Sequence, residues 1–297
     1  MSKIYVLYNT AAGRDTTLEV LKALNGTLDG DTEFVEVTAI TDHKVFFSGL
    51  EADDKLVLCG GDGTLNRFVN DTEGVEIKGD ILYYPCGSGN DFAHDLEHVK
   101  GDAPFVINDY IKDLPLVEVK CQKYRFVNGV GYGIDGYCCE VGDELKKSSD
   151  KPVNYTSIAI KGLLFHYKPT NAKITVDGKE HNYKKVWLAP TMTGRYYGGG
   201  MMPTPAQSRL DREKLSTLVF HGSGKLHTLM IFPSLFKGEH IKHTKVAEVL
   251  TGSVITVEFD RPTALQIDGE TILGVTSYTA YSRALSNKKE EKATASV

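Results

Sequence analysis

The chain has 297 residues, 41% hydrophobic and 25% charged, which is an ordinary globular composition and enough for two domains. Its formal net charge of −5 excludes a general attraction to nucleic acid or anionic lipid, so such a contact must come from a local patch. No apolar run approaches the roughly 20 residues that span a bilayer, and the N-terminus lacks the apolar core of a signal peptide. Five cysteines without metal-type spacing favour reduced thiols. We therefore expect a cytoplasmic protein without a transmembrane segment.

The first part of the chain alternates strand and helix patterns. Helices are expected over 16–24 and from near Thr64 and Asn90, and strands are expected over 3–9, 32–40, 54–60 and 80–85. Repeated βα units of this length indicate a parallel sheet in an N-terminal α/β domain, residues 1–116.

After residue 116 the pattern changes to short β-rich runs separated by turn residues. Such spacing is typical of an antiparallel β-sandwich, here expected over 117–285. The stretch 129–136, GVGYGIDG, is expected to be a strand turn without a following helix. The apolar segment 226–236 is expected to form a core helix with a kink at Pro233. The alternatives are that it lines a cavity for acyl chains or contacts a membrane. The charged tail 286–297 is expected to be disordered.

The stretch Gly60-Gly61-Asp62-Gly63-Thr64 joins an expected buried strand to an expected helix. Glycine lets backbone amides approach a ligand closely and permits positive φ. A helix N-terminus offers N–H donors and a positive dipole end to phosphate. Thr64 can cap the helix or donate its hydroxyl to phosphate, and Asp62 can order the loop or a bound Mg²⁺-nucleotide. A tight βα turn with Asp62 as its local cap is the alternative.

Two more loops of this character follow strands. The strand over 80–85 leads into CGSGNDFA (86–93), and the strand over 3–9 leads into NTAAG (9–13). The carboxyl ends of parallel strands lie on one edge of a sheet, so the three loops are expected to meet there as a nucleotide crevice. The chain has no Walker A motif and no protein-kinase signature.

The ordered motifs resemble the diacylglycerol kinase catalytic-domain family, which includes bacterial lipid kinases and sphingoid-base kinases and is more distantly related to NAD kinases. The resemblance covers nearly the whole chain and lies in GGDGTLN (60–66), PCGSGNDFA (85–93), FVNGVGYGIDG (126–136), GGGMMPTPAQSRLDREKL (198–215), KGEHIKHTKV (237–246) and LQIDGE (265–270). It implies an ATP-binding α/β domain, a β-sandwich domain that takes the lipid, and catalysis between them.

The resemblance also implies the residues that contact ATP. Ser88 stands where the family more often has threonine and keeps the hydroxyl, while Thr10 replaces a proline at some cost in loop rigidity. Thr38, or alternatively Thr41, is the threonine at the end of the second strand. The full implied set is Asn9, Thr10, Ala11, Ala12, Gly13, Thr38, Gly60, Gly61, Asp62, Gly63, Thr64, Leu65, Asn66, Arg67 and Ser88.

Phosphoryl transfer to an alcohol needs a held triphosphate, Mg²⁺ and a carboxylate that takes the hydroxyl proton. The resemblance assigns the proton acceptor to Glu270 of the sequence DGE, and a water-mediated role at Mg²⁺ to Asp268. From the residues alone, a plain β-turn at Asp268-Gly269 is the alternative.

For the metal, the resemblance implies a D-G-x-L segment that this chain lacks. Matching the leucine places Glu213 at the acidic position, with Leu210 and Leu215 as carbonyl donors and Asp211 as the competing ligand. Oxygen ligands of this kind suit Mg²⁺. Glu118 is a weaker candidate for the same water network. A solvated turn over 211–214 is the alternative.

The expected function is that of an ATP- and Mg²⁺-dependent kinase acting on diacylglycerol or a related lipid, with reversible docking on a membrane surface and no nucleic-acid partner. Two alternatives remain: a nucleotide-binding regulatory protein that has lost catalysis, suggested by the missing D-G, and an NAD kinase. Exposed strand edges of a sandwich often pair, so a homodimer is one option.

Overall fold

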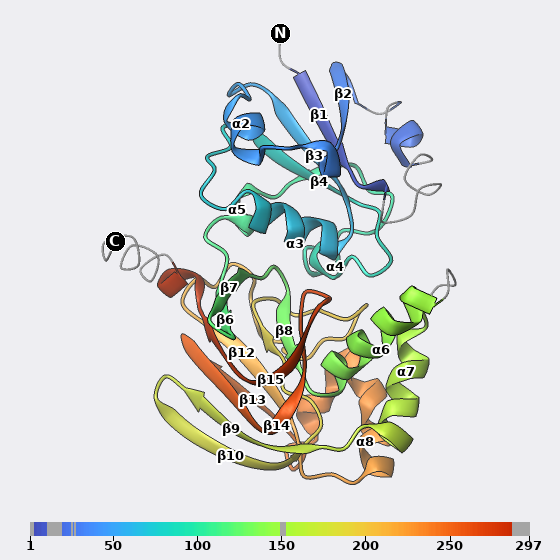
Figure 1. Cartoon of the computed structure of the whole chain (residues 1–297), viewed down its shortest axis with the longest axis vertical. Helices are drawn as coiled ribbons and strands as arrows, with labels where there is room; N and C mark the ends of the chain where they lie inside the picture. The colour runs from blue at the N-terminus through green and yellow to red at the C-terminus, as the bar shows by residue number, and fades with distance from the viewer. Residues whose placement is uncertain (1–2, 11–19, 25, 27, 149–152, 287–297) are drawn as a thin grey trace. The chain divides into compact units, whose positions relative to one another are not determined.

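The computed structural model describes residues 3–10, 20–24, 26, 28–148 and 153–286 (Figure 1). The chain divides into two compact units between Lys112 and Asp113. This division lies four residues before the boundary that the sequence places after residue 116, because the strand that begins at Leu116 pairs only with strands of the second unit.

The first unit is built on a five-stranded sheet. Its strands are β1 (Lys3–Tyr8), β2 (Asp31–Glu36), β3 (Lys55–Gly60), β4 (Asp80–Pro85) and β5 (Phe105–Val106), in the order β2-β1-β3-β4-β5. The first four strands are parallel, and β5 runs antiparallel to β4. The central strand β3 is buried from Leu56 to Gly60, as its apolar sequence predicts for a strand covered on both faces. The predicted α/β fold is confirmed.

Short helices connect these strands: α2 (His43–Ser48), α3 (Asp62–Asp71), α4 (Asp91–Asp95) and α5 (Asn108–Ile111), with a 3₁₀ turn, η2 (Val37–Ala39), after β2. The helix α3 buries Leu65, Phe68 and Val69, which share one face at spacings of three and four residues. The helix expected over 16–24 is present at 20–24, and positions 16–19 lie outside the described residues.

The second unit is an antiparallel sheet that folds into a sandwich, as the sequence predicts. The longest strand, β14, has register shifts in its pairing with β15 between Glu258 and Thr263. Its first half pairs with β9 and its second half pairs with β8. Strands that change partner at such irregularities form the corners of sandwiches. The strands are β6 (Leu116–Val119), β7 (Gln122–Arg125), β8 (Gly129–Tyr132), β9 (Thr170–Val176), β10 (Lys179–Val186), β11 (Thr191–Met192), β12 (Leu215–Phe220), β13 (Ala247–Gly252), β14 (Val254–Ile267) and β15 (Glu270–Tyr281).

Helical segments gather at one side of this unit (Figure 1). They are α6 (Ile134–Ser148), α7 (Tyr155–Lys161), the π-helical turn η3 (Gly162–His166), α8 (Lys225–Ile231) and the 3₁₀ segments η4 (Phe232–Lys237) and η5 (Glu239–Lys242). The expected helix over 226–236 is therefore present, and it changes from α to 3₁₀ beside Pro233, where the kink was predicted.

The prediction that no helix follows GVGYGIDG is wrong, because β8 leads directly into the fifteen-residue helix α6. The two glycines within this helix favoured a turn, but packing explains them. A Cβ on Gly136 would lie 2.0 Å from the carbonyl oxygen of Ala264, and one on Gly142 would lie 2.6 Å from the ring of Tyr155. The strand before α6 is antiparallel to its neighbours, so the segment is still not a dinucleotide-binding βαβ unit.

Candidate functional site

Three loops of the first unit leave the carboxyl edge of its parallel sheet. They follow β1 at Tyr8, β3 at Gly60 and β4 at Pro85. The backbone N–H of Cys86 donates to the carbonyl oxygen of Gly60 over 2.9 Å, and the hydroxyl of Tyr83 donates to the same oxygen over 3.1 Å. The loops after β3 and β4 are thus tied together at their first residues.

Two glycines let these loops touch. A Cβ on Gly87 would lie 2.4 Å from the Cα of Gly61, closer than real side chains approach backbone. The side chain of Asn90 fixes the turn, because its Oδ1 accepts from the N–H of Gly87 and its Nδ2 donates to the carbonyl of Gly87, both over 2.9 Å. Gly63 differs, since a Cβ there would meet nothing within 4 Å. The loop therefore stays bare on the side that faces open space.

Asp62 joins the two loops through its carboxylate. Its Oδ2 accepts from the N–H of Asp91 over 3.0 Å, and its Oδ1 accepts from the N–H of Phe92 over 2.8 Å. These N–H groups belong to the first turn of α4, where no helical carbonyl can reach them. Of the two roles considered from the sequence, ordering the loop is the one that these hydrogen bonds support.

The N-terminus of α3 has no side-chain cap. Its N-cap residue is Gly61, and the N–H of Leu65 donates to the carbonyl oxygen of Gly61 over 3.1 Å. Thr64 lies in this first turn, and its side chain occupies the place that a Cβ on Gly60 would need. The backbone N–H groups and the positive dipole end of a helix N-terminus suit a phosphate.

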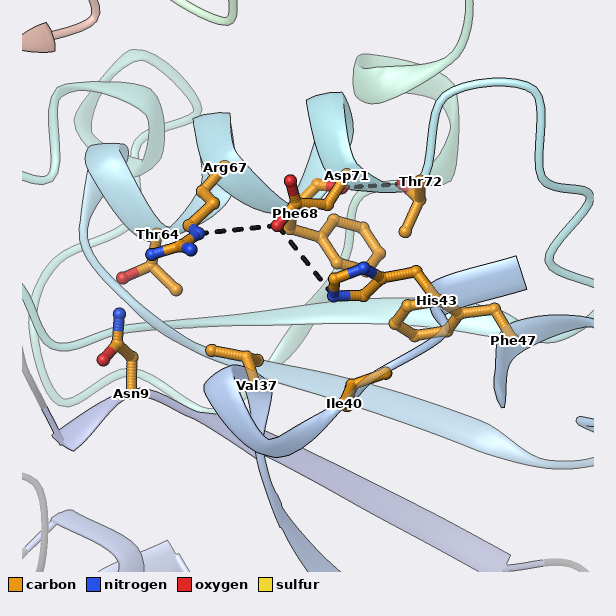
Figure 2. A pocket seen from close by; sticks show the side chains of 10 residues that line it. All are labelled: Asn9, Val37, Ile40, His43, Phe47, Thr64, Arg67, Phe68, Asp71 and Thr72. Carbon is orange, nitrogen blue, oxygen red and sulfur yellow. Dashed lines mark hydrogen bonds and ion pairs between the residues drawn. The ribbon is translucent and has the colours of Figure 1, made fainter. Parts of the chain in front are cut away.

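A small pocket of about 20 Å³ lies beside this turn (Figure 2). Asn9 and Thr64 lie at one end, and a row of charged groups follows, in which Asp71 Oδ2 is 3.5 Å from Arg67 Nε and 3.9 Å from His43 Nε2. Apolar side chains form the rest of the wall. The lining residues are Asn9, Val37, Ile40, His43, Phe47, Thr64, Arg67, Phe68, Asp71 and Thr72.

The pocket brings together three of the residues that sequence reasoning assigned to ATP: Asn9, Thr64 and Arg67. Ser88 is exposed on the neighbouring loop, whereas the side chain of Leu65 is fully buried and only its backbone can face a ligand. Ala11, Ala12 and Gly13 lie outside the described residues.

Thr38 lies in the 3₁₀ turn after β2 and donates its hydroxyl to Glu36 Oε1 over 3.2 Å. The same carboxylate accepts from the N–H of Thr10 over 3.1 and 3.2 Å, and so ties the end of β2 to the end of β1. Sequence reasoning missed His43 and Asp71. The signal for His43 is its place at the start of α2, directly after the cap residue Asp42.

In the second unit, the sequence DGE forms a two-residue hairpin between β14 and β15. Ile267 pairs with Glu270, and the residues between them, Asp268 and Gly269, have φ of 47° and 100°. Two positive φ values are the mark of the type I′ turn that suits a hairpin. The turn that the residues alone suggested is therefore present, and the side chains of Asp268 and Glu270 have different surroundings.

Asp268 points back to the backbone before β8. Its Oδ2 accepts from the N–H of Val127 over 2.5 Å, and its Oδ1 accepts from Asn128 N and Gly129 N over 2.9 Å each. A carboxylate with three such donors is firmly placed. Glu270, in contrast, is exposed at the first position of β15. The hairpin thus holds one carboxylate as a structural anchor and presents the other to solvent.

Asp135, in the first turn of α6, is connected to this hairpin through Gln266. Its Oδ2 and Gln266 Nε2 both lie within 2.4 Å of where a Cβ on Gly131 would be, and Gln266 Oε1 accepts from Gly269 N over 2.7 Å. Both carboxylate oxygens are buried without a well-formed hydrogen bond among the described residues. Burial raises the pKa of Asp135 to about 6, although Tyr197 and Gln266 lie close enough to oppose the shift.

The segment proposed for the metal forms a turn before β12. Asp211 Oδ1 accepts from Glu213 N over 2.9 Å and from Lys214 N over 3.1 Å, while Glu213 and Leu210 are exposed and Leu215 begins β12 opposite Gly252. Glu118 accepts from the hydroxyl of Tyr281 over 2.9 Å. The described residues contain no group of three or more His, Cys, Asp or Glu side chains that could hold a metal ion.

Comparisons with known proteins agree with both units. Residues 3–116 match the family model of the diacylglycerol kinase catalytic domain, and residues 128–283 match that of the YegS C-terminal NAD kinase beta sandwich-like domain. The chain is 23% identical over 282 residues to the diacylglycerol kinase of Bacillus subtilis, which covers 91% of this chain and 90% of the relative. It is 24% identical over 228 residues to the diacylglycerol kinase of Mycobacterium tuberculosis, which covers 74% and 71%.

A crystal structure of a diacylglycerol kinase from Bacillus anthracis has the same fold, with a TM-score of 0.64 over 95% of this chain and 94% of that chain at 18% identity. Among the described residues, no helix is long and apolar enough to cross a membrane. The two family matches follow one another in the order of the two structural units. The chain therefore belongs to the diacylglycerol kinase catalytic-domain family of lipid kinases.

Proposed function

We propose that this protein is an ATP-dependent lipid kinase that transfers the γ-phosphate to the hydroxyl of diacylglycerol or a related lipid. The observation that carries the proposal is the close contact of two glycine loops at the N-terminus of α3, which has no side-chain cap, in a chain of this family. Phosphoryl transfer depends mainly on holding the phosphates and the acceptor in line, and these loops supply fixed backbone donors for the phosphates.

We place ATP on the glycine loops of the first unit. The phosphates lie on the bare side of Gly63 and on the N–H groups of the first turn of α3, with Thr64 and Ser88 as hydroxyl donors. The apolar side chains beside this turn, which include Val37 and Ile40, are the proposed contact surface for the base or the ribose. Thr38 belongs to the same 3₁₀ turn as Val37.

Glu270 is the proposed proton acceptor. As the lipid oxygen forms a bond to the γ-phosphorus, its proton passes to the Glu270 carboxylate, the bond to the bridging oxygen breaks, and ADP leaves. Asp268 is a positioning residue, because its oxygens already accept three backbone N–H groups. It fixes the turn from which Glu270 projects.

The segment 210–215 fits Mg²⁺ in part. Asp211 uses one oxygen for its own turn, which leaves the other oxygen and the exposed Glu213 as carboxylate ligands, with Leu210 and Leu215 as carbonyl donors. Mg²⁺ bound to phosphates keeps several waters and takes few protein ligands, so a sparse set is sufficient. When bound, the ion neutralises phosphate charge.

The proposal is tested by transfer of labelled γ-phosphate from ATP to a panel of lipids in detergent micelles. Wild-type protein is expected to label diacylglycerol or another lipid alcohol, and Glu270→Gln is expected to label none while still binding ATP. Glu144→Gln, an exposed glutamate on α6, is the matched control and is expected to behave as wild type. Folded, ATP-bound wild-type protein that labels no lipid would refute the proposal.

One observation favours a second candidate, a nucleotide-binding regulatory protein without turnover. The turn over 211–214 uses Asp211 in its own backbone hydrogen bonds and lacks the D-G sequence of the family. This candidate predicts ATP binding with no lipid labelling by wild-type protein, and no effect of Glu270→Gln on ATP affinity.

A further inference from the structure

The segments 155–166 and 225–237 of the second unit expose large apolar side chains side by side. Phe165 is 72% exposed, Leu226 73% and Met230 75%, and Ile160 and Phe236 are more than 40% exposed. The segments adjoin, because Lys225 Nζ donates to the carbonyl oxygen of Leu164 over 2.8 Å. We name the exposed face of these two segments the α7–α8 surface.

The same helices are apolar on their inner faces too. Ile158, Leu163, Ile231 and Leu235 are buried in one hydrophobic cluster, so the helices are fixed to the unit. The outward apolar side chains therefore do not take part in the core packing that holds these helices in place. Leu226 and Met230 are four residues apart and lie on one face of α8. A helix that is apolar on both sides normally has a second apolar partner.

The side chains of these two segments that carry a full charge are all lysines. No Asp or Glu occurs in residues 153–176 or 215–238, whereas Lys161, Lys168, Lys225 and Lys237 lie within them. The next acidic residue, Glu239, is paired with Lys242 over 2.8 Å. A chain whose formal net charge is −5 thus places lysines and no carboxylates in these two segments of exposed apolar side chains. Lysines in such a place can lay their stems on apolar surface and keep their charges in water.

We propose that the α7–α8 surface docks on an anionic lipid bilayer, with Phe165, Leu226 and Met230 entering the interface and the lysines contacting anionic headgroups. This rests on the proposed function, which requires a lipid substrate drawn from a membrane. Apolar burial and lysine attraction are the two terms that hold amphipathic helices on bilayers. Phe165, Leu226 and Met230 are each about three-quarters exposed, so they can enter fluid lipid without moving the helices that hold them.

The test is flotation with vesicles of phosphatidylcholine alone and with added phosphatidylglycerol, without ATP. Phe165→Ser/Leu226→Ser/Met230→Ser is expected to bind phosphatidylglycerol vesicles about 100-fold more weakly than wild type, because three interfacial side chains are lost. Lys161→Gln/Lys237→Gln is expected to lose about 25-fold on those vesicles and to bind phosphatidylcholine unchanged.

The matched control is Val45→Ser/Val99→Ser, which removes two similarly exposed apolar side chains from the first unit and is expected to float as wild type. Unfolding curves of each variant establish that it is folded. The triple variant is expected to keep wild-type lipid phosphorylation in detergent micelles, which separates docking from catalysis.

Two outcomes would overturn the inference: flotation of the triple variant equal to wild type, or no flotation of wild type on either vesicle. If the first outcome comes with a change of oligomeric state in the triple variant, the surface is a contact between copies of this chain. Loss of lipid phosphorylation by wild type in micelles would instead count against the proposed function.

Discussion

Replacing Asp135 with asparagine is expected to stabilise the second unit at pH 8 and to change its stability little at pH 4. Burial disfavours the ionised form of this carboxyl and raises its pKa to about 6, from an ordinary value of 3.8. Below pH 3.8 the group is neutral in both the folded and the unfolded chain. As the pH rises through 6, the folded protein must ionise a buried group, and stability is lost.

The expected size follows from the gap between the two pKa values. A gap of about 2 corresponds to ~3 kcal/mol, and this is the largest amount by which the stability difference between variant and wild type can change with pH. Most of the change is expected between pH 4 and pH 6. Asparagine cannot ionise, and it can use the same neighbours, Gln266 and Tyr197, as hydrogen-bond partners.

The chain offers a natural probe for this measurement. Its single tryptophan, Trp187, is 2% exposed in the same unit as Asp135, and its Nε1 donates to Ser223 O over 3.0 Å. Urea unfolding followed by tryptophan fluorescence therefore reports on that unit. Glu144→Gln on the same helix is the control and is expected to change stability by less than about 0.5 kcal/mol at either pH. An equal effect of Asp135→Asn at pH 4 and pH 8, or a loss of stability at pH 8, would refute the reasoning.

Four further outcomes follow from the loops and the hairpin. Gly87→Ala is expected to lower the melting temperature and to abolish nucleotide binding, because its Cβ would lie 2.4 Å from Gly61 Cα. A Cβ at Gly63 would meet nothing within 4 Å, so Gly63→Ala is expected to leave the melting temperature unchanged and to weaken nucleotide binding as measured by calorimetry. Asp62→Asn is expected to destabilise the first unit by about 1–3 kcal/mol in thermal unfolding, since an amide replaces a carboxylate that accepts two N–H groups. Asp268→Asn is expected to lower kcat with little change in KM for ATP; an unchanged kcat would contradict its positioning role.

The parallel sheet could be predicted because its strands are apolar runs whose loops carry glycine, and those local features decide their structure. The helix α6 could not be predicted in the same way. Gly136 and Gly142 weaken a helix by local propensity, and their reason is the close approach of Ala264 and Tyr155 from other segments. Local sequence contains no sign of such a contact.

The same distinction between local and distant contacts applies to the candidate site. The loop from Gly60 to Thr64 could be predicted from the sequence because its donor groups lie in one short stretch. The engagement of Asp268 is not, because its hydrogen-bond donors lie at 127–129, about 140 residues earlier in the chain. His43 and Asp71 meet across the pocket only after α2 and α3 have packed.

The shared strand β14 has a consequence for the order in which the protein folds during synthesis. Every strand of the first unit lies within residues 3–106, so that unit can complete its sheet while the rest is still being translated. The sandwich cannot do so, because β8 and β9 both require β14, and β14 pairs with β15 up to Tyr281. Nearly the whole chain must therefore leave the ribosome before the sheet of the second unit can form. Until then its apolar strands are exposed, and only chaperones or rapid folding protect them from aggregation.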